Sequence, residues 1–421
     1  MAKIVIIGGG AAGMTAAIAA AWADPSHEIL ILEHKNQLGK KLLSTGNGRC
    51  NFTNAYMEKE CFYSDSKDVI PCVLDKFGTD ETLDFFRKLG VYPKDRNGYY
   101  YPRSDQAQTI QQLLILELKT LGVTYKTDIH VTEVQRNKKG FRIFTDTPGM
   151  SIHADRLILA CGGRAAAVLG SDGSGYTLAK MLGHSLVPVV PALVQLKVKS
   201  HPLAKASGVR TETKVEIFDG SDTNNHPVIL GSDTGEVQIT AYGISGIPVF
   251  QISRLAAKLL YEKKTPVVRI DFFPGMSEEE LKSYLQKRTQ NRETYMVSEF
   301  LLGLLNQKLI TVLLKTAGIP EKLYVKKLKT PDWERLISTL KRLELVISDT
   351  NGFDNAQVCA GGVNLTEIAS DTMESRICKD LYLAGELLDV DGICGGYNLQ
   401  WAWASGYLAG CAAAGKKNTG K

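Results

Sequence analysis

The eight cysteines of this 421-residue chain include no C-x-x-C pair and no spacing that suits a metal ion. The seven histidines show no metal-ligand spacing either. These absences argue against a zinc module and against a small disulfide-stapled domain. The pattern is typical of reduced thiols, and we expect a cytoplasmic protein without a metal site.

A strong excess of one charge is also missing. The 50 basic and 45 acidic residues give a net charge of +5, spread along the chain. We therefore expect a small-molecule substrate, with no nucleic-acid or membrane partner, and the oligomeric state stays open. The uncharged stretch 4–23 is rich in glycine and alanine, so it predicts a buried β-α unit rather than a membrane span or signal peptide.

A dinucleotide-binding fingerprint opens the chain. The apolar strand 4–7 runs into Gly8, Gly10 and Gly13, and Glu33 follows at the end of a second apolar strand. The first glycine permits a tight turn, and the second lets the backbone approach a pyrophosphate. The third lets the next helix pack closely, and the acid can bind ribose hydroxyls. Strand, glycines, helix and acid together make the signal strong.

Three further segments favour FAD over a simple nicotinamide cofactor, because a flavin is contacted by distant parts of its domain. Residues 38–51 form a glycine-rich loop with two lysines and an arginine, which can cradle pyrophosphate. Residues 157–163 read as a buried strand that ends in Gly-Gly. Glu386 can bind a ribityl hydroxyl, and a helix that begins near Asn398 can direct its positive end to the flavin.

These motifs resemble one bacterial flavoprotein family. The resemblance covers essentially the whole chain and is carried by the fingerprint and by residues 45–51, 170–176, 243–246, 360–363 and 385–400. Members are aminoacetone-oxidase-like or NAD(P)/FAD-dependent oxidoreductases, and one is a bile-acid enone reductase. Cys359 and Cys394 replace a common threonine, and residues 163–167 are less polar than usual. The latter change is more similar to the bile-acid branch.

The resemblance implies FAD contacts at a specific set of residues. These are Gly10, Ala12, Glu33, Lys41, Cys50, Asn51, Glu386, Asn398 and Leu399, with a backbone contact from Val131 to adenine. The motifs themselves add Gly8, Gly13, Gly48, Ala160, Gly162 and Gly385. Cys50 lacks a second cysteine at the interval that disulfide reductases use, so we interpret it as a free buried thiol.

The implied fold is α/β, a glutathione-reductase-type, Rossmann-like FAD domain with an inserted β-barrel-like and helical substrate domain. The predicted boundaries are 1–190 and 345–421 for the FAD domain and 191–344 for the insertion. Within these, helices are predicted over 80–89 and 105–121, with Asp105 as an N-cap. A further helix is predicted after Ser277, which can cap it.

The expected activity is reduction of a C=C bond conjugated to a ketone, as in a bile-acid enone. No second strand–glycine–helix unit is present, so NAD(P)H would act as a transient co-substrate. Tyr397, Tyr101 and Arg103 are the candidate catalytic residues, as proton donors or, for Arg103, as a clamp on a carbonyl or carboxylate. The alternatives are a flavin oxidase of small amines such as aminoacetone and a flavin-dependent tRNA-modifying protein.

Overall fold

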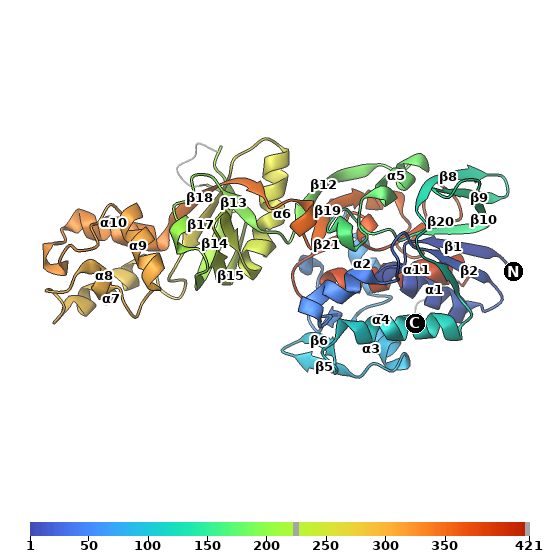
Figure 1. The fold of residues 1–421 in the computed structure, drawn as a ribbon, viewed down its shortest axis with the longest axis horizontal. Helices are drawn as coiled ribbons and strands as arrows, with labels where there is room; N and C mark the ends of the chain where they lie inside the picture. The colour runs from blue at the N-terminus through green and yellow to red at the C-terminus, as the bar shows by residue number, and fades with distance from the viewer. Residues whose placement is uncertain (222–226, 417–421) are drawn as a thin grey trace. The chain divides into compact units, whose positions relative to one another are not determined.

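The computed structural model describes residues 1–221 and 227–416. The chain divides into two compact units, one formed by residues 1–189 with 357–421 and the other by residues 190–356 (Figure 1). The first unit therefore uses both ends of the chain, because the second is inserted into it. Among the described helices, none is long and apolar enough to cross a membrane.

A five-stranded parallel sheet forms the centre of the first unit, in the order β20-β11-β1-β2-β7. Its strands are β1 (Lys3–Ile7), β2 (Glu28–Leu32), β7 (Thr124–Lys126), β11 (Arg156–Leu159) and β20 (Leu381–Leu383). The central strands are apolar on both faces, as expected for a parallel sheet that is covered on both sides. The predicted Rossmann-like fold is confirmed.

Six helices and several short antiparallel pairs complete this unit. The helices are α1 (Ala11–Ala23), α2 (Val69–Leu74), α3 (Thr79–Lys88), α4 (Ala107–Thr120), α5 (Ser174–Met181) and α11 (Tyr397–Ala413). The antiparallel groups are β8 (Val131–Asn137), β9 (Gly140–Thr145) and β10 (Ser151–Ala154); β3 (Thr53–Asn54), β5 (Pro93–Arg96) and β6 (Tyr99–Pro102); and β4 (Phe62–Tyr63) with β21 (Asp391–Gly392). β12 (Leu186–Ala192) pairs with β19 (Val358–Val363) where the chain leaves and re-enters the unit.

The two helices α1 and α11 lie side by side, although they come from opposite ends of the sequence (Figure 1). Glycine makes this approach possible. A Cβ on Gly406 would collide with the backbone of Ala12, and one on Gly410 would collide with the carbonyl of Ala16. The alanines of α1 present an equally small surface, so the two backbones pack without intervening side chains.

The second unit is a closed barrel with an attached helical group. The barrel order is β13-β16-β15-β14-β17-β18, built from β13 (Leu196–Val198), β14 (Arg210–Asp219), β15 (Gly231–Ile239), β16 (Gly243–Ser245), β17 (Pro266–Asp271) and β18 (Leu343–Thr350). Its helices are α6 (Ile247–Tyr261), α7 (Glu278–Thr289), α8 (Val297–Phe300), α9 (Gln307–Thr316) and α10 (Thr330–Lys341). Figure 1 shows α7 to α10 gathered together.

The N-cap predicted for α7 is confirmed, whereas the N-cap predicted for α4 and the domain boundary at residue 345 differ from the structure. Ser277 caps α7 as predicted: its hydroxyl accepts from the Glu280 N–H, and the Glu280 carboxylate accepts from the Ser277 N–H. Asp105 does not cap α4, which begins after Gln106, because its carboxylate instead pairs with Lys94 and Arg96. Residues 345–356, predicted in the FAD domain, lie in the second unit, because β18 closes the barrel.

The helix pair gives a first prediction. Gly410→Ala forces the α1 and α11 backbones apart, and such overpacking costs about 1–3 kcal/mol of unfolding free energy. Gly275→Ala is the matched control, since a Cβ there meets no described atom within 4 Å and its φ is not positive. Denaturant unfolding of both variants checks this. Equal stability of the two variants would contradict the packing account.

Candidate dinucleotide-binding site

The turn after β1 has the geometry of a phosphate-binding loop. Gly8 has φ +104°, and a Cβ there would collide with the Ala160 carbonyl at the end of β11. A Cβ on Gly13 would collide with the Gly8 carbonyl, so the turn closes directly onto α1. At Gly10 a Cβ would meet no described atom within 4 Å. The turn is thus tight on the protein side and open where a phosphate group can approach.

Glu33 is held in place at the end of β2. Its Oε2 accepts a hydrogen bond from the Gly9 N–H at 2.8 Å, and its Oε1 accepts from the Lys35 N–H at 2.8 Å. The side chain is buried. Because each carboxylate oxygen can accept a second hydrogen bond, Glu33 can still bind a ribose diol. The same contact ties the acid to the glycine turn.

Lys41 and Glu386 meet across 345 positions of sequence. The Lys41 Nζ lies 2.8 Å from Glu386 Oε2 and 3.4 Å from Ser171 Oγ. The other Glu386 oxygen accepts the Cys359 N–H at 3.0 Å. Both charged side chains are largely buried, so each provides the opposite charge that the other needs. Two predicted FAD contacts are therefore brought together.

Tyr176 and Cys359 stand beside this pair, and no role was predicted for either. A Cβ on Gly163 would lie 2.8 Å from Glu386 Oε1, 3.1 Å from the Tyr176 hydroxyl and 3.2 Å from Cys359 Sγ. Burial and the neighbouring Cys359 raise the pKa of Tyr176 well above its ordinary value. Its buried hydroxyl has no oxygen or nitrogen partner among the described residues. The sequence feature that could have pointed to Tyr176 is the motif at residues 170–176, which contains this residue.

The loop that follows Lys41 contains a strained cysteine. Cys50 is fully buried and has φ +57°, a conformation that is costly for a residue with a side chain. Burial raises the pKa of its thiol to about 12, although Thr45 acts in the opposite sense. Next to it, the buried Oδ1 of Asn51 has no hydrogen-bond partner among the described residues. The loop thus presents an acceptor that a ligand can satisfy.

The N-terminus of α11 is fixed by its own side chains. Both side-chain polar atoms of Asn398 bond to the backbone of Gly392, each at 2.8 Å. Asn398 and Leu399 can therefore contact a cofactor through backbone N–H groups, which lack partners in the first turn of a helix. Farther along α11, the Ser405 hydroxyl accepts the Gly385 N–H, and the Trp401 indole donates to the Gly385 carbonyl. The helix thereby also holds the segment that carries Glu386.

The other predicted contacts come from several segments of the first unit. Val131 is the first residue of β8, Ala160 follows β11, and Gly162 has φ +74° with Ser171 Oγ beside it. Gly48 has φ +80°, and a Cβ there would lie 3.9 Å from the Leu43 carbonyl oxygen. Ala12 lies in the first turn of α1 against Gly385. The roles of these residues as cofactor contacts stay predictions.

The three candidate catalytic residues have different surroundings. Tyr397 is buried, its ring meets Phe62 edge-on, and burial with the nearby Cys61 thiol raises its pKa. Tyr101 is half-buried beside Gly46, with the guanidinium groups of Arg49 and Arg96 5.7 and 5.4 Å from its ring centre.

Arg103 is exposed and lies over the Tyr92 ring rather than over Tyr101. Of the three candidates, Tyr101 is therefore the one placed against the 46–51 loop while still exposed to solvent in part.

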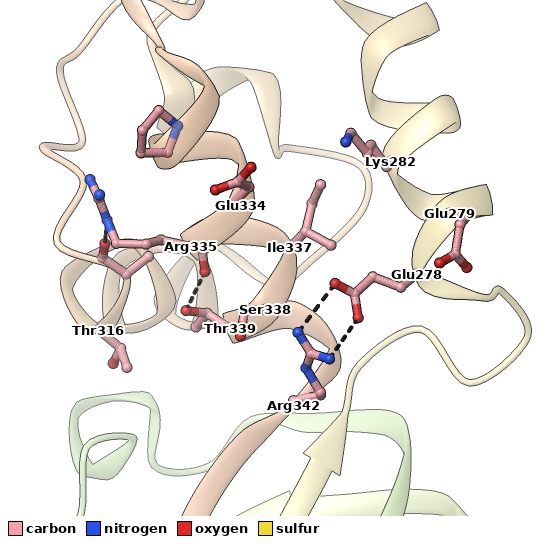
Figure 2. A pocket seen from close by; sticks show the side chains of 12 residues that line it. Glu278, Glu279, Lys282, Thr316, Glu334, Arg335, Ile337, Ser338, Thr339 and Arg342 are labelled. Carbon is pink, nitrogen blue, oxygen red and sulfur yellow. Dashed lines mark hydrogen bonds and ion pairs between the residues drawn. The ribbon is translucent and has the colours of Figure 1, made fainter.

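A separate cavity of about 700 Å³ lies in the helical part of the second unit, between α7 and α10 (Figure 2). Glu278 and Arg342 form an ion pair across its rim. None of the predicted site residues lines it.

The residues present fit FAD. The open face at Gly10, the unpartnered Asn51 oxygen and the remaining acceptor capacity of Glu33 each match part of a dinucleotide. The turn at Gly10 and Glu33 stand at the carboxyl ends of the parallel strands β1 and β2, where open α/β sheets bind ligands.

Comparison with known proteins shows the family to which the chain belongs. The family model of the HI0933-like protein Rossmann domain matches residues 2–412. The chain belongs to this family. It is 53% identical over 414 residues to a 3-dehydro-bile acid delta(4,6)-reductase of Clostridium scindens, covering 98% of this chain and 99% of that one. It is a flavoprotein oxidoreductase.

A second relative and one solved structure resemble the chain more distantly. The chain is 30% identical over 408 residues to a ribosomal RNA dihydrouridine synthase of Escherichia coli, covering 96% of each chain. A quinol-fumarate reductase structure solved with menaquinol molecules superposes with a TM-score of 0.51 at 16% identity, covering 100% of this chain and 72% of that one. The latter shows likeness of fold alone.

The Lys41–Glu386 pair gives a second prediction. Glu386→Gln keeps the side-chain volume but removes the charge beside Lys41, and we expect at least a tenfold loss of FAD affinity, about 1.4 kcal/mol. Glu28→Gln removes an exposed acid that pairs with Lys3 in the same unit and should bind FAD normally. Titration of the apoprotein by flavin fluorescence checks both. Normal affinity of the Glu386 variant would remove this residue from the site.

The buried thiol gives a third prediction. With a pKa of about 12, roughly 10⁻⁴ of the Cys50 thiols are ionised at pH 8, so alkylation there should be negligible. The exposed Cys72 should react readily under the same conditions. Peptide mass spectrometry after iodoacetamide treatment gives the comparison. Labelling of Cys50 as fast as Cys72 would show an accessible, reactive thiol instead.

Proposed function

We propose that the chain is an NAD(P)H-dependent reductase of C=C bonds conjugated to a ketone, with a 3-oxo-steroid or bile-acid-like enone as substrate. The observation that carries the proposal is the 53% identity, over nearly the full length of both chains, to a 3-dehydro-bile acid delta(4,6)-reductase. Such identity, together with a site assembled from both chain ends, supports a shared reaction as well as a shared fold.

The names of two relatives describe related chemistry. A delta(4,6)-reductase of a 3-dehydro-bile acid saturates C=C bonds in conjugation with a ketone, and dihydrouridine is uridine whose ring C=C bond, conjugated to a carbonyl, has been reduced. Such a bond is reduced when its electron-poor β-carbon takes up a hydride and its α-carbon a proton. A conjugated C=C bond is therefore the substrate feature that the proposal retains.

FAD, when bound, supplies a hydride for the β-carbon of the enone. The chain's residues would bind and orient it: the turn at Gly10 would hold the pyrophosphate, Glu33 the ribose, and Glu386 with Lys41 the ribityl chain. The N-terminus of α11 would favour negative charge on the flavin. The substrate still needs a proton.

Tyr101 is the proton donor that we propose. It lies beside the 46–51 loop and is partly exposed, whereas Tyr397 is enclosed against Phe62 and Cys61. NAD(P)H, for which the sequence has no second binding fingerprint, would enter, reduce the enzyme and leave before the enone binds.

Anaerobic stopped-flow spectroscopy of the FAD-loaded protein tests the function. We expect rapid bleaching by NADH or NADPH, none by aminoacetone, and reoxidation by a 3-oxo-Δ4,6 bile acid. Rapid bleaching by aminoacetone alone would establish an amine oxidase instead. Reoxidation by a uridine-containing RNA fragment, and not by the enone, would move the substrate to nucleic acid.

A fourth prediction concerns the proton donor. Tyr101→Phe should slow reoxidation by the enone about 10²-fold, since general acid catalysis contributes a factor of this order, and leave reduction by NAD(P)H unchanged. Tyr397→Phe, matched in chemistry, should change reoxidation little. The same stopped-flow traces compare them. The reverse ranking would assign proton transfer to Tyr397.

A further inference from the structure

Two histidines and an aspartate converge at one edge of the first unit. His34 follows β2, His130 precedes β8, and Asp172 lies just before α5. One ligand atom from each lies within 4.8 Å of the other two. The histidines are 96 positions apart, which is why no metal-ligand spacing is visible in the sequence.

The backbone fixes the two histidines relative to each other. The Ile129 N–H donates to the Glu33 carbonyl at 3.0 Å, and the Asp128 N–H donates to the Lys35 carbonyl at 3.1 Å. The residues on either side of His34 are thereby tied to the segment before His130. The two imidazole rings meet edge-on, with centres 5.7 Å apart.

The polar atoms of this cluster are arranged for a further ligand. The His34 Nε2 is buried and makes no hydrogen bond with any described residue, although Asp172 Oδ2 stands 3.8 Å away. The other Asp172 oxygen accepts both the N–H and the hydroxyl of Ser174, which orients the carboxylate.

We propose that His34, His130 and Asp172 form a binding site for a zinc ion. Two imidazoles and a carboxylate are a ligand set that zinc accepts, with a fourth position left for water. Ligand atoms around a tetrahedral zinc ion lie roughly 3.3 Å apart, and the three here lie within 4.8 Å of one another. A modest rotation of the side chains would therefore bring them to zinc-binding distance. The ion would join the segment before α5 to the end of β2. His34 and His130 adjoin Glu33 and Val131, two predicted FAD contacts, and the His34 Nδ1 lies 3.7 Å from Glu33 Oε1. The inference does not depend on the proposed enone reduction.

Zinc titration of the FAD-loaded protein by calorimetry tests the site, in a Cys72→Ser background that removes the exposed thiol. We expect one equivalent to bind, and a loss of at least tenfold in affinity in His34→Gln, His130→Gln and Asp172→Asn. His153→Gln is the matched control, because His153 also faces an aspartate, Asp155, but is absent from the cluster.

X-ray absorption at the zinc edge provides the second readout, which does not depend on activity. Imidazole nitrogen and carboxylate oxygen at about 2.0–2.2 Å, without sulfur at about 2.3 Å, is the expected shell. No saturable binding, sulfur ligation, or unchanged affinity in the histidine variants would each overturn the proposal. An unchanged melting temperature of the flavin-free protein shows that a variant is folded.

Discussion

Close backbone contact at glycine is the constraint on which the rest of this structure depends. Gly8 and Gly13 let the turn after β1 fold directly onto α1, while Gly406 and Gly410 let α11 lie against α1. Any side chain at these positions would collide with a carbonyl group. The first and last parts of the chain are thereby joined into one unit, with the second unit inserted between them.

That joining places charges from both chain ends at one site. Lys41 comes from the N-terminal part and Glu386 from the C-terminal part, and their largely buried ion pair is stable only because both segments are held in place. α11 fixes Gly385 through Ser405 and Trp401, so the packing of this helix also controls the position of Glu386. Fold stability and cofactor binding should consequently be coupled here.

The Rossmann-like fold and the glycine turn with Glu33 could be predicted from the sequence, because strand, glycine and acid patterns have local physical causes. The fingerprint, Glu33 and the capping box at Ser277 are examples in which neighbouring residues determine the conformation. Asp105 was mispredicted as a cap, because two basic side chains 11 and 9 positions earlier compete for its carboxylate.

Other features depend on tertiary contacts that no local pattern encodes. Tyr176 and Cys359 reach Glu386 from separate segments, and His34 meets His130 only through β2 and the segment before β8. The sequence predicts residues 345–356 in the C-terminal part of the FAD domain. In the structure, β18 pairs with β13 and β17 and so belongs to the barrel.

We infer that one FAD molecule is bound by residues from both ends of the chain. A crystal structure of the FAD-loaded protein would test this inference. We expect electron density with the pyrophosphate at Gly8–Gly13, ribose on Glu33, and the flavin ring against the N–H groups at Asn398 and Leu399. Density for FAD that contacts only one chain end, or a protein that takes up no FAD, would contradict it.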